Sequence, residues 1–251
     1  ERTSRALADH AHRAREAGVA SIDVVATGAL RLASNGEAAR RALERRSGLS
    51  IRVIDGQTEA RFALAGVRTH VGEHADLALI DVGGSSTECI VARGTAIDAV
   101  SLNVGVITLS EWVNERDEAR RAIALCARAR QEVARVRLPA IGATLPCFAT
   151  GGAAVALAAY RRGARYLEFV PGDDDGLSSS DLETIFARFA SAPLAERART
   201  LHISPEHCDL VPAGFAILTA VLADTRAPRI LPTMRGVAEG LLHDVSRGDR
   251  E

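Results

Sequence analysis

The sequence contains no lysine, and it has little of several other residue types. Every basic side chain other than histidine is arginine. A gene rich in G and C is the simplest cause of the complete absence of lysine. Arginine can also bind phosphate bidentately, which lysine cannot. Aromatic residues are few, with one tryptophan, two tyrosines and six phenylalanines. We expect these, Trp112 included, to lie in the core.

Long apolar runs and paired cysteines are also absent. No uninterrupted apolar run reaches the roughly 18 residues of a membrane span, and no signal-peptide pattern opens the chain. The four cysteines lie far apart, without disulfide or metal-ligand spacing. We therefore expect reduced thiols, a cytoplasmic protein and no membrane partner.

The composition is that of an ordinary globular protein. The chain has 251 residues, which is long enough for two compact units, with 47% hydrophobic and 25% charged residues. Its net charge of −1 gives no indication of a nucleic-acid partner. Arginines exceed acidic residues in 1–62 and are outnumbered in 63–251, which is compatible with a polyanion near the first segment.

The most informative segment is a polar turn between two apolar runs, at residues 81–88. Two glycines and three hydroxyl residues make up the turn, and its backbone N–H groups could form a concave site for an anion such as phosphate. The flanking carboxylates of Asp81 and Glu88 suit Mg²⁺, which takes one or two carboxylates together with phosphate oxygens. An ordinary Gly-Gly hairpin with solvated ends is the alternative.

Glu59 stands 22 residues before Asp81, in the segment Ile54-Asp55-Gly56-Gln57-Thr58-Glu59-Ala60-Arg61. With this segment and the turn, the chain resembles the Ppx/GppA family of exopolyphosphatases and guanosine pentaphosphate phosphohydrolases. Further matches follow in the family's order, at residues 26–35, 101–111, 149–153, 205–209 and 235–240.

The resemblance implies a role for each matching residue. Glu59 falls on the catalytic base, and Asp81 and Glu88 fall on carboxylates that would hold Mg²⁺. The implied phosphate ligands are Gly83, Gly84, Ser85, Ser86, Thr87, Thr150, Gly151, Gly152 and Arg31. The implied reaction removes terminal orthophosphate from polyphosphate or from guanosine pentaphosphate, and the sequence does not choose between them. The oligomeric state is left open, with a homodimer as one option.

Departures from the family pattern keep a second function open. Ser85 replaces a glycine in the turn, where the backbone could need a positive φ. Thr108, His207 and Ala238 stand where the family usually has arginine. A catalytically degenerate sensor that binds polyphosphate or a nucleotide is the alternative to an enzyme. A related kinase is disfavoured, since Glu59-Ala60-Arg61 matches the hydrolases.

The implied fold is α/β, of the actin-like ATPase (ribonuclease H-like) type, with two related domains. We predict the C-terminal part of the first domain over 1–62 and the second domain over 63–248. The family places further strands and an aspartate-glycine-serine-asparagine-serine loop ahead of the helix at 1–17. Nothing in the chain matches them, so we expect an N-terminally incomplete first domain.

Alternating helix and strand signals fit this fold. We predict strands at 22–26, 50–54, 77–82, 87–92, 96–102, 145–150 and 229–233. Helices are predicted at 1–17, 36–47, 57–67, about 115–137, 151–161, 193–200, 209–223 and from 235, with one more capped by Ser180 or Asp181.

Two other polar groups are poor metal sites. Asp173-Asp174-Asp175 lacks the alternating ligands and final glutamate of an EF-hand, so we expect a solvated loop. His70 and His74 have helical spacing, but Gly72 interrupts it and no third ligand is within reach.

Overall fold

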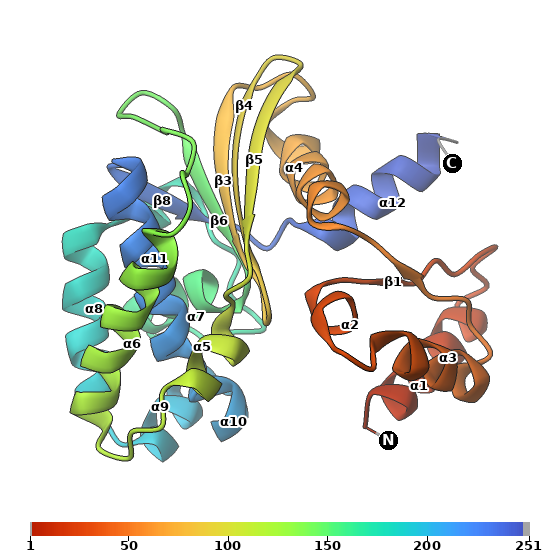
Figure 1. The fold of residues 1–251 in the computed structure, drawn as a ribbon, viewed down its shortest axis with the longest axis horizontal. Helices are drawn as coiled ribbons and strands as arrows, with labels where there is room; N and C mark the ends of the chain where they lie inside the picture. The colour runs from red at the N-terminus through yellow and green to blue at the C-terminus, as the bar shows by residue number, and fades with distance from the viewer. Residues whose placement is uncertain (1, 248–251) are drawn as a thin grey trace. The chain divides into compact units, whose positions relative to one another are not determined.

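The computed structural model of the chain describes residues 2–247 and divides between Glu59 and Ala60 into two compact units (Figure 1). The predicted domains, 1–62 and 63–248, are close to these units in extent, although residues 1 and 248 lie outside the described residues. Their assignment to the two actin-like domains stays a prediction, because compactness alone does not decide it.

The first unit is mostly helical. Its strands β1 (Val25–Ala26) and β2 (Arg52–Val53) form a short parallel pair, with Val25 opposite Arg52. Its helices are α1 (Arg2–Glu16), α2 (Gly28–Leu32), α3 (Gly36–Ser47) and the first residues of α4 (Gly56–Val71). The predicted helix at 36–47 is confirmed, and Gly48 ends it in the left-handed conformation that glycine adopts without strain.

The second unit is built on a six-stranded mixed sheet with the order β5-β4-β3-β6-β8-β7. The strands are β3 (Leu77–Val82), β4 (Thr87–Arg93), β5 (Ala96–Leu102), β6 (Cys147–Thr150), β7 (Leu177–Ser178) and β8 (Arg229–Pro232). Strand β6 runs parallel to its neighbours β3 and β8, while the β3-β4-β5 meander and the β7-β8 pair are antiparallel. The α/β prediction is confirmed.

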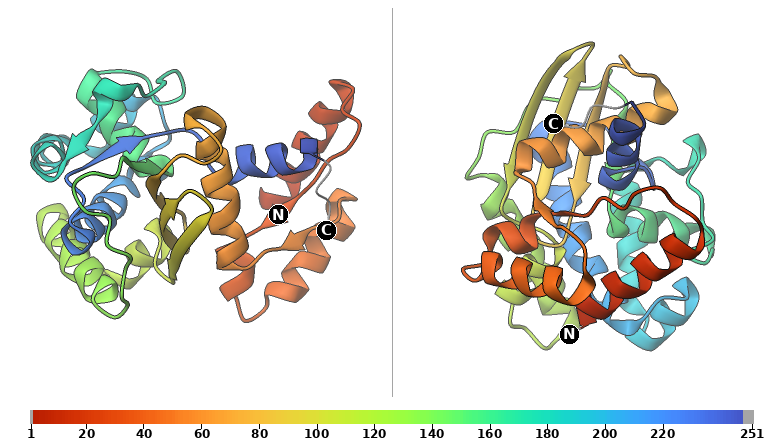
Figure 2. Two further views of the ribbon diagram at one scale, coloured as in Figure 1. Left: turned by 90° about the horizontal axis from the view of Figure 1, so that it is seen from above. Right: turned by 90° about the vertical axis from the view of Figure 1, so that its right-hand side faces the viewer.

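Helices cover both faces of this sheet, as Figure 2 shows. On one face, Leu77 and Leu79 pack in a cluster with Ala63 and Leu64 of α4. The alternate residues of the same strand, such as Ile80, pack on the opposite face against the larger core. The helices that follow the meander are α5 (Val106–Trp112), α6 (Glu118–Val133), α7 (Gly152–Arg162), α8 (Ser179–Ser191), α9 (Leu194–Leu201), α10 (Pro205–Cys208), α11 (Val211–Thr225) and α12 (Val237–Arg247).

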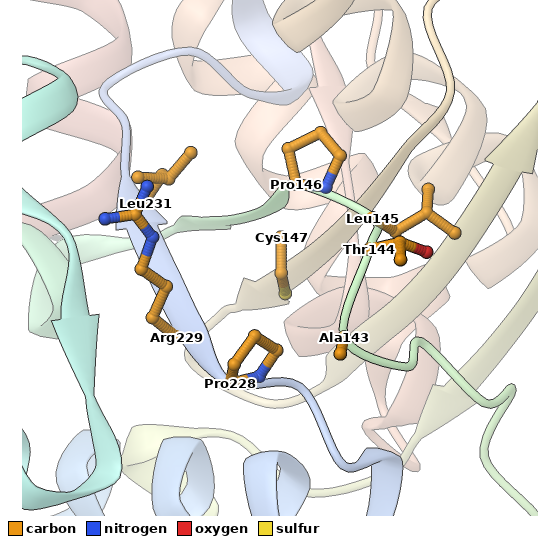
Figure 3. Close-up of a pocket in the computed structure, with 8 residues that line it drawn as sticks. All are labelled: Ala143, Thr144, Leu145, Pro146, Cys147, Pro228, Arg229 and Leu231. Carbon is orange, nitrogen blue, oxygen red and sulfur yellow. The ribbon is translucent and has the colours of Figure 1, made fainter.

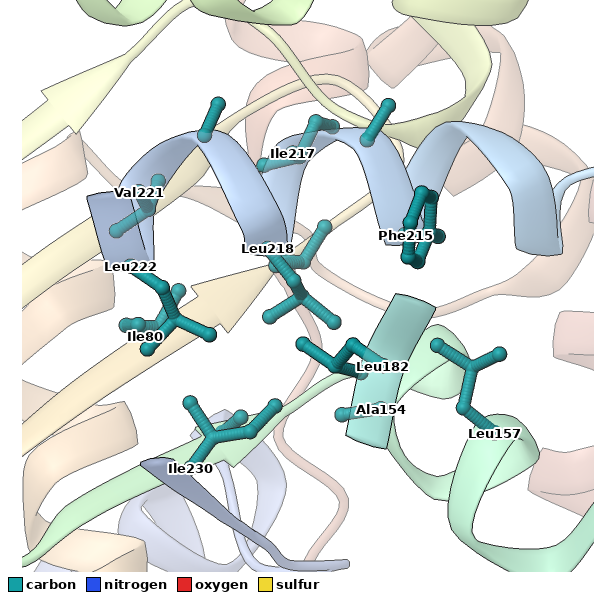
Figure 4. Packing of buried hydrophobic residues seen from close by; sticks show 14 of the residues in the cluster. Ile80, Ala154, Leu157, Leu182, Phe215, Ile217, Leu218, Val221, Leu222 and Ile230 are labelled. Carbon is teal, nitrogen blue, oxygen red and sulfur yellow. The ribbon is translucent and has the colours of Figure 1, made fainter. Parts of the chain in front are cut away.

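Helix α11 lies at the centre of the larger core. Leu218 and Leu222 point toward Ile80 of β3, and Phe215 stacks on Phe186 with ring centroids 3.9 Å apart (Figure 4). The stretch Pro205–Thr225 is also long and apolar enough to span a membrane, with a mean hydropathy of 1.5. Because 72% of it is buried inside the fold, this is weak evidence for a span and the usual property of a core helix.

Several local predictions were wrong at the level of single residues. The cap of α8 is Ser178, whose hydroxyl accepts from the Asp181 N–H, and Asp181 is the third helical residue. Trp112 is 45% exposed, with the Arg128 guanidinium 4.9 Å from its ring centroid. The acidic loop is only partly solvated, because Asp175 is buried and pairs with Arg161 and Arg162. The long helix α6 is shorter than predicted, and the short helices α2, α5 and α10 were not predicted.

Candidate active site

The turn at residues 83–86 joins β3 to β4 and is held by the start of α5. The Gly83 N–H donates to the Ser86 carbonyl at 3.0 Å. The carbonyls of Gly83 and Gly84 accept from Val106 and Ile107 at 2.9 and 2.8 Å. The first N–H groups of α5 therefore occupy the Gly83 and Gly84 carbonyls. This arrangement favours the exposure of N–H groups of the turn to another acceptor, such as a phosphate oxygen.

Close packing, and not a positive φ, explains the glycines around this turn. Gly105 lies so near the turn that a Cβ there would be 2.4 Å from the Gly84 carbonyl carbon. Among the described residues other than glycine, only His202 and Arg226 have a positive φ, so Ser85 does not have one. The serine in place of the family's glycine is therefore unstrained.

A second loop approaches the turn at the end of β6. Thr150 ends the strand, Gly151 has φ of 97° and Gly152 begins α7. A Cβ on Gly151 would lie 2.2 Å from the Val82 carbonyl oxygen. The N-terminus of α7, which carries free N–H groups and a partial positive charge, thus starts directly beside the end of β3.

Strand register places four polar residues in one row across the sheet. Asp81 is opposite Glu88 on one side and Thr150 on the other, and Glu88 is opposite Ser101. Directly paired residues project from the same face of a sheet. The row Ser101, Glu88, Asp81, Thr150 therefore lies on one face, and the Ser101 hydroxyl donates to Glu88 Oε1 at 2.7 Å.

A third loop, after β8, adjoins the same row. The Thr233 N–H donates to the Ala149 carbonyl at 2.9 Å. Gly236 lies so close that a Cβ there would be 3.1 Å from Thr150 Oγ1, and its N–H donates to Glu239 Oε2 at 2.8 Å. No individual role was predicted for Gly236 or Glu239. The glycine that precedes an acidic residue by three positions was the signal that could have indicated them.

In the first unit, Arg31 and Glu59 form an ion pair in which Glu59 is buried and Arg31 is half-buried. Arg31 Nη1 donates to Glu59 Oε2 at 2.8 Å and to the Ile54 carbonyl at 2.9 Å. Glu59 is 6% exposed and lies in the first turn of α4, where the Asp55 carboxylate accepts from the Thr58 N–H at 2.7 Å. Only Nη1 makes these two bonds, so neither of them occupies the Nε or Nη2 groups.

Burial sets the candidate residues apart from other polar side chains. Eight polar or charged residues of the described chain are buried, and five of them are predicted site residues: Glu59, Ser86, Thr87, Glu88 and Thr150. Buried polar groups cost free energy unless they are paired, so a cluster of them usually serves a function or a specific bond. Thr87 has such a bond, because its hydroxyl donates to the Val104 carbonyl at 2.6 Å.

Asp81 and Glu88 suit Mg²⁺ as a pair of neighbouring carboxylates. Within residues 2–247 no group of three or more His, Cys, Asp and Glu side chains could hold a metal. A two-carboxylate site is nevertheless what Mg²⁺ uses when phosphate oxygens and water complete its six ligands. Glu88 is 1% exposed, whereas Asp81 is half-buried, so Asp81 is the more accessible donor.

The thiols do not suit nucleophilic chemistry. All four cysteines are free, and burial raises the pKa of Cys89 to about 12 and that of Cys208 to about 11. Burial also raises the pKa of Cys126 and Cys147. Thiols with raised pKa stay protonated near neutral pH and are poor nucleophiles.

Comparison with known proteins identifies the family. A sequence model of the Ppx/GppA phosphatase family matches residues 1–247. The chain belongs to the Ppx/GppA phosphatase family. The predicted resemblance is thereby confirmed, and the chain is assigned to the phosphatase class of hydrolases.

Solved structures of other proteins share the fold. The crystal structure of the Aquifex aeolicus Ppx/GppA family member superposes with a TM-score of 0.74 at 22% identity, covering 100% of this chain and 82% of that chain. An exopolyphosphatase from Cytophaga hutchinsonii gives a TM-score of 0.78 at 19% identity, covering 98% and 81%. An exopolyphosphatase-like protein gives 0.80 at 22% identity, covering 98% and 83%. The fold is that of the actin-like ATPases, as predicted.

Proposed function

We propose that this protein is a Mg²⁺-dependent phosphohydrolase that releases terminal orthophosphate from inorganic polyphosphate or from guanosine pentaphosphate. The observation that carries the proposal is the polar row on one face of the sheet, where Asp81, Glu88 and Thr150 meet two loops rich in glycine. Free thiols support a cytoplasmic location.

Phosphoryl transfer to water requires positioning and charge neutralisation more than covalent chemistry. Asp81 and Glu88 would hold Mg²⁺, which would supply the positive charge that neutralises the phosphate oxygens. The N–H groups of Gly84, Ser85, Ser86 and Thr87, and those of Thr150, Gly151 and Gly152, would bind these oxygens. The Gly83 N–H already donates to the Ser86 carbonyl, so Gly83 would contribute by letting the turn approach the phosphate closely.

Glu59 would orient and deprotonate the attacking water. Its Oε2 accepts from Arg31, so Oε1 is the oxygen that would accept from the water. Arg31 would hold the carboxylate in place through Nη1 and bind a neighbouring phosphate through its other N–H groups.

A sensor without turnover is the second candidate, and Thr108 favours it. The Thr108 hydroxyl accepts from the Gly105 N–H at 2.8 Å and so caps α5. It stands where the family usually has arginine, and a neutral cap cannot replace a guanidinium on phosphate. Phosphoryl transfer depends on neutralising the charge of the phosphate oxygens, so loss of a guanidinium there lowers turnover.

Orthophosphate release separates the two candidates. With Mg²⁺, we expect the full-length protein to release orthophosphate from short polyphosphate or guanosine pentaphosphate, and EDTA to stop the release until Mg²⁺ is restored. Binding of either compound without release over hours would support the sensor.

Glu59→Gln tests the role of the base. We expect phosphate release to fall by about 100-fold or more, because proton transfer is lost, while substrate affinity stays nearly unchanged. Glu37→Gln is the matched control, since Glu37 also pairs with arginines but lies on the exposed surface of α3. Equal turnover in Glu59→Gln and the control would remove Glu59 from the mechanism.

A further inference from the structure

The first residues of helix α7, at the end of the loop that follows β6, each meet a different neighbour. Gly151 packs against the end of β3, where there is no room for a Cβ. Ala153 packs against α11, because a Cβ on Gly214 would lie 2.0 Å from the Ala153 Cβ. Gly152 between them is exposed, and the atom that a Cβ there would meet, at 3.4 Å, is the Tyr166 hydroxyl oxygen. A phenol therefore lies beside the N-terminus of α7.

Tyr166 reaches this place from the segment that follows α7, and it is held there at both the ring and the backbone. Its half-buried ring packs against the larger core. Its N–H donates to the Leu201 carbonyl at the end of α9 at 2.9 Å, and its carbonyl accepts from the Phe169 N–H at 3.4 Å. A donor that is already held in position loses little freedom when a ligand binds.

The hydroxyl of Tyr166 is available to a ligand. Burial raises the pKa of Tyr166 above its ordinary value, so the phenol keeps its proton at neutral pH and stays a hydrogen-bond donor. Among the residues that the structure describes, none forms a hydrogen bond with this hydroxyl. The O–H group of a partly buried tyrosine usually has a partner, and a bound ligand would supply one here.

One phosphate group can contact both α7 and Tyr166. Covalent geometry keeps a Cβ within about 2.5 Å of its own backbone nitrogen, so the Tyr166 oxygen lies within about 6 Å of the Gly152 nitrogen. Two hydrogen bonds of about 2.8 Å that meet on one phosphate group can span this distance. Residues 151–153 have no polar side chain, so the phenol supplies a side-chain donor that the start of α7 lacks.

We propose that Tyr166 is a substrate-binding residue whose hydroxyl donates a hydrogen bond to the phosphate group held at the N-terminus of α7. This inference rests on the proposed function, since it takes the loop at 150–152 as a phosphate site. The phenol is neutral and keeps its proton, so its bond is made to the bound substrate and to the transition state alike. Tyr166 therefore contributes to substrate affinity and not to the chemical step.

The chain has two tyrosines, Tyr160 and Tyr166, so carbon-13 at the ζ position of both rings gives two signals that Tyr→Phe variants assign. The full 251-residue chain is titrated with pyrophosphate in the presence of Mg²⁺, and backbone amide shifts are followed in the same samples. We expect the Tyr166 signal to shift together with the amides of 83–87 and 150–152. The Tyr160 signal should stay in place, because that ring packs edge-on against Phe189 with centroids 5.0 Å apart.

The amide shifts separate failure of this inference from failure of the proposed function. Shifts at both loops without a change at Tyr166 would overturn the inference and leave the proposed function standing. A cavity of about 230 Å³ lies at the other end of β6, between residues 143–147 and 228–231 (Figure 3). Shifts centred on that cavity, or no shift at either loop, would overturn the inference and the proposed function together.

Tyr166→Phe removes the hydroxyl and keeps the ring. We expect the KM for short polyphosphate in the full-length protein, and the Kd for pyrophosphate, to rise about 3–10-fold, with kcat within about twofold of wild type. Tyr160→Phe is the matched control and should change neither constant. A purely structural hydroxyl would instead lower the urea midpoint and leave both constants unchanged. Equal Kd values in the two variants would overturn the role of Tyr166, whether or not the protein turns over substrate.

Discussion

Gly151 combines a backbone conformation and a contact that only glycine permits. Its φ of 97° disfavours any side chain, and its Cα faces the Val82 carbonyl oxygen at a distance that leaves no room for a Cβ. The backbone of the β6-α7 loop therefore packs directly against the backbone at the end of β3. A phosphate at this loop would be bound by backbone N–H groups and not by flexible side chains.

Gly151→Ala should be much more destabilising than an alanine at another left-handed glycine. Gly163 also has positive φ, at 63°, but nothing lies within 4 Å of its Cβ position, so Gly163→Ala isolates the conformational cost of about 1 kcal/mol. We expect Gly151→Ala to cost about 2 kcal/mol more, because the loop must move to relieve the clash. Urea denaturation of both variants measures the difference. Equal midpoints would show that the loop adapts freely.

Asp175 makes stability depend on pH. Burial alone would raise the pKa of Asp175, but the Gly172 N–H and the guanidinium groups of Arg162 and Arg161 outweigh it, so the pKa is lowered. A lowered carboxyl pKa stabilises the fold above the unfolded value of about 3.9, and this stabilisation is lost as the pH falls through the folded pKa.

Asp175→Asn should therefore destabilise the protein at pH 7 by about 2 kcal/mol, since it removes charge-assisted bonds to two arginines. The difference from wild type should shrink as the pH is lowered past 3.9, which thermal melts across pH can follow. Asp174→Asn is the control, because Asp174 is exposed and should change stability little at any pH. A constant difference between Asp175→Asn and wild type from pH 7 to pH 3 would contradict this account.

At the scale of elements, the two sheets differ greatly in burial. Strands β1 and β2 have two residues each, and none of these is buried. In β3 and β4 nearly every residue is buried between α4 and the larger core. Backbone hydrogen bonds exchange slowly where opening requires the loss of much buried surface.

Hydrogen exchange followed by mass spectrometry should show this difference. We expect amides of Leu77–Val82 and Thr87–Arg93 to exchange at least about 100-fold more slowly than those of Val25–Ala26 and Arg52–Val53. The helix α3, with one buried residue, should exchange at an intermediate rate or faster. Equal protection across both sheets would mean that the first unit is as stable as the second.

Elements with a strong local signal could be predicted from the sequence, and short ones could not. The three strands of the meander follow apolar runs separated by turns, and the structure has them at the predicted residues. Helices α5 and α10 have seven and four residues, which is too short for a periodic pattern. The cap of α8 was misplaced because four residues at its start, Ser178 to Asp181, could all serve as caps.

At the scale of the whole molecule, the site depends on pairings that are distant in sequence. The carboxylates of Asp81 and Glu88 could be predicted as neighbours because a tight turn joins them. The alignment of Thr150 with Asp81, and of Ser101 with Glu88, depends on ladders that local patterns do not fix. The contact of Gly236 with Thr150 likewise joins segments more than 80 residues apart, as the residue numbers show. The sequence therefore indicated the candidate residues but not the row that unites them.

The row of Ser101, Glu88, Asp81 and Thr150 also determines which kinds of genetic change the site could survive. A substitution elsewhere in β3, β4 or β6 leaves these four side chains on their common face. Deletion or insertion of one residue within a strand reverses every side chain beyond it, so Asp81 would turn away from Thr150 while the core lost its apolar face. In a library that contains both kinds of change, these strands should accept conservative substitutions and reject single-residue length changes.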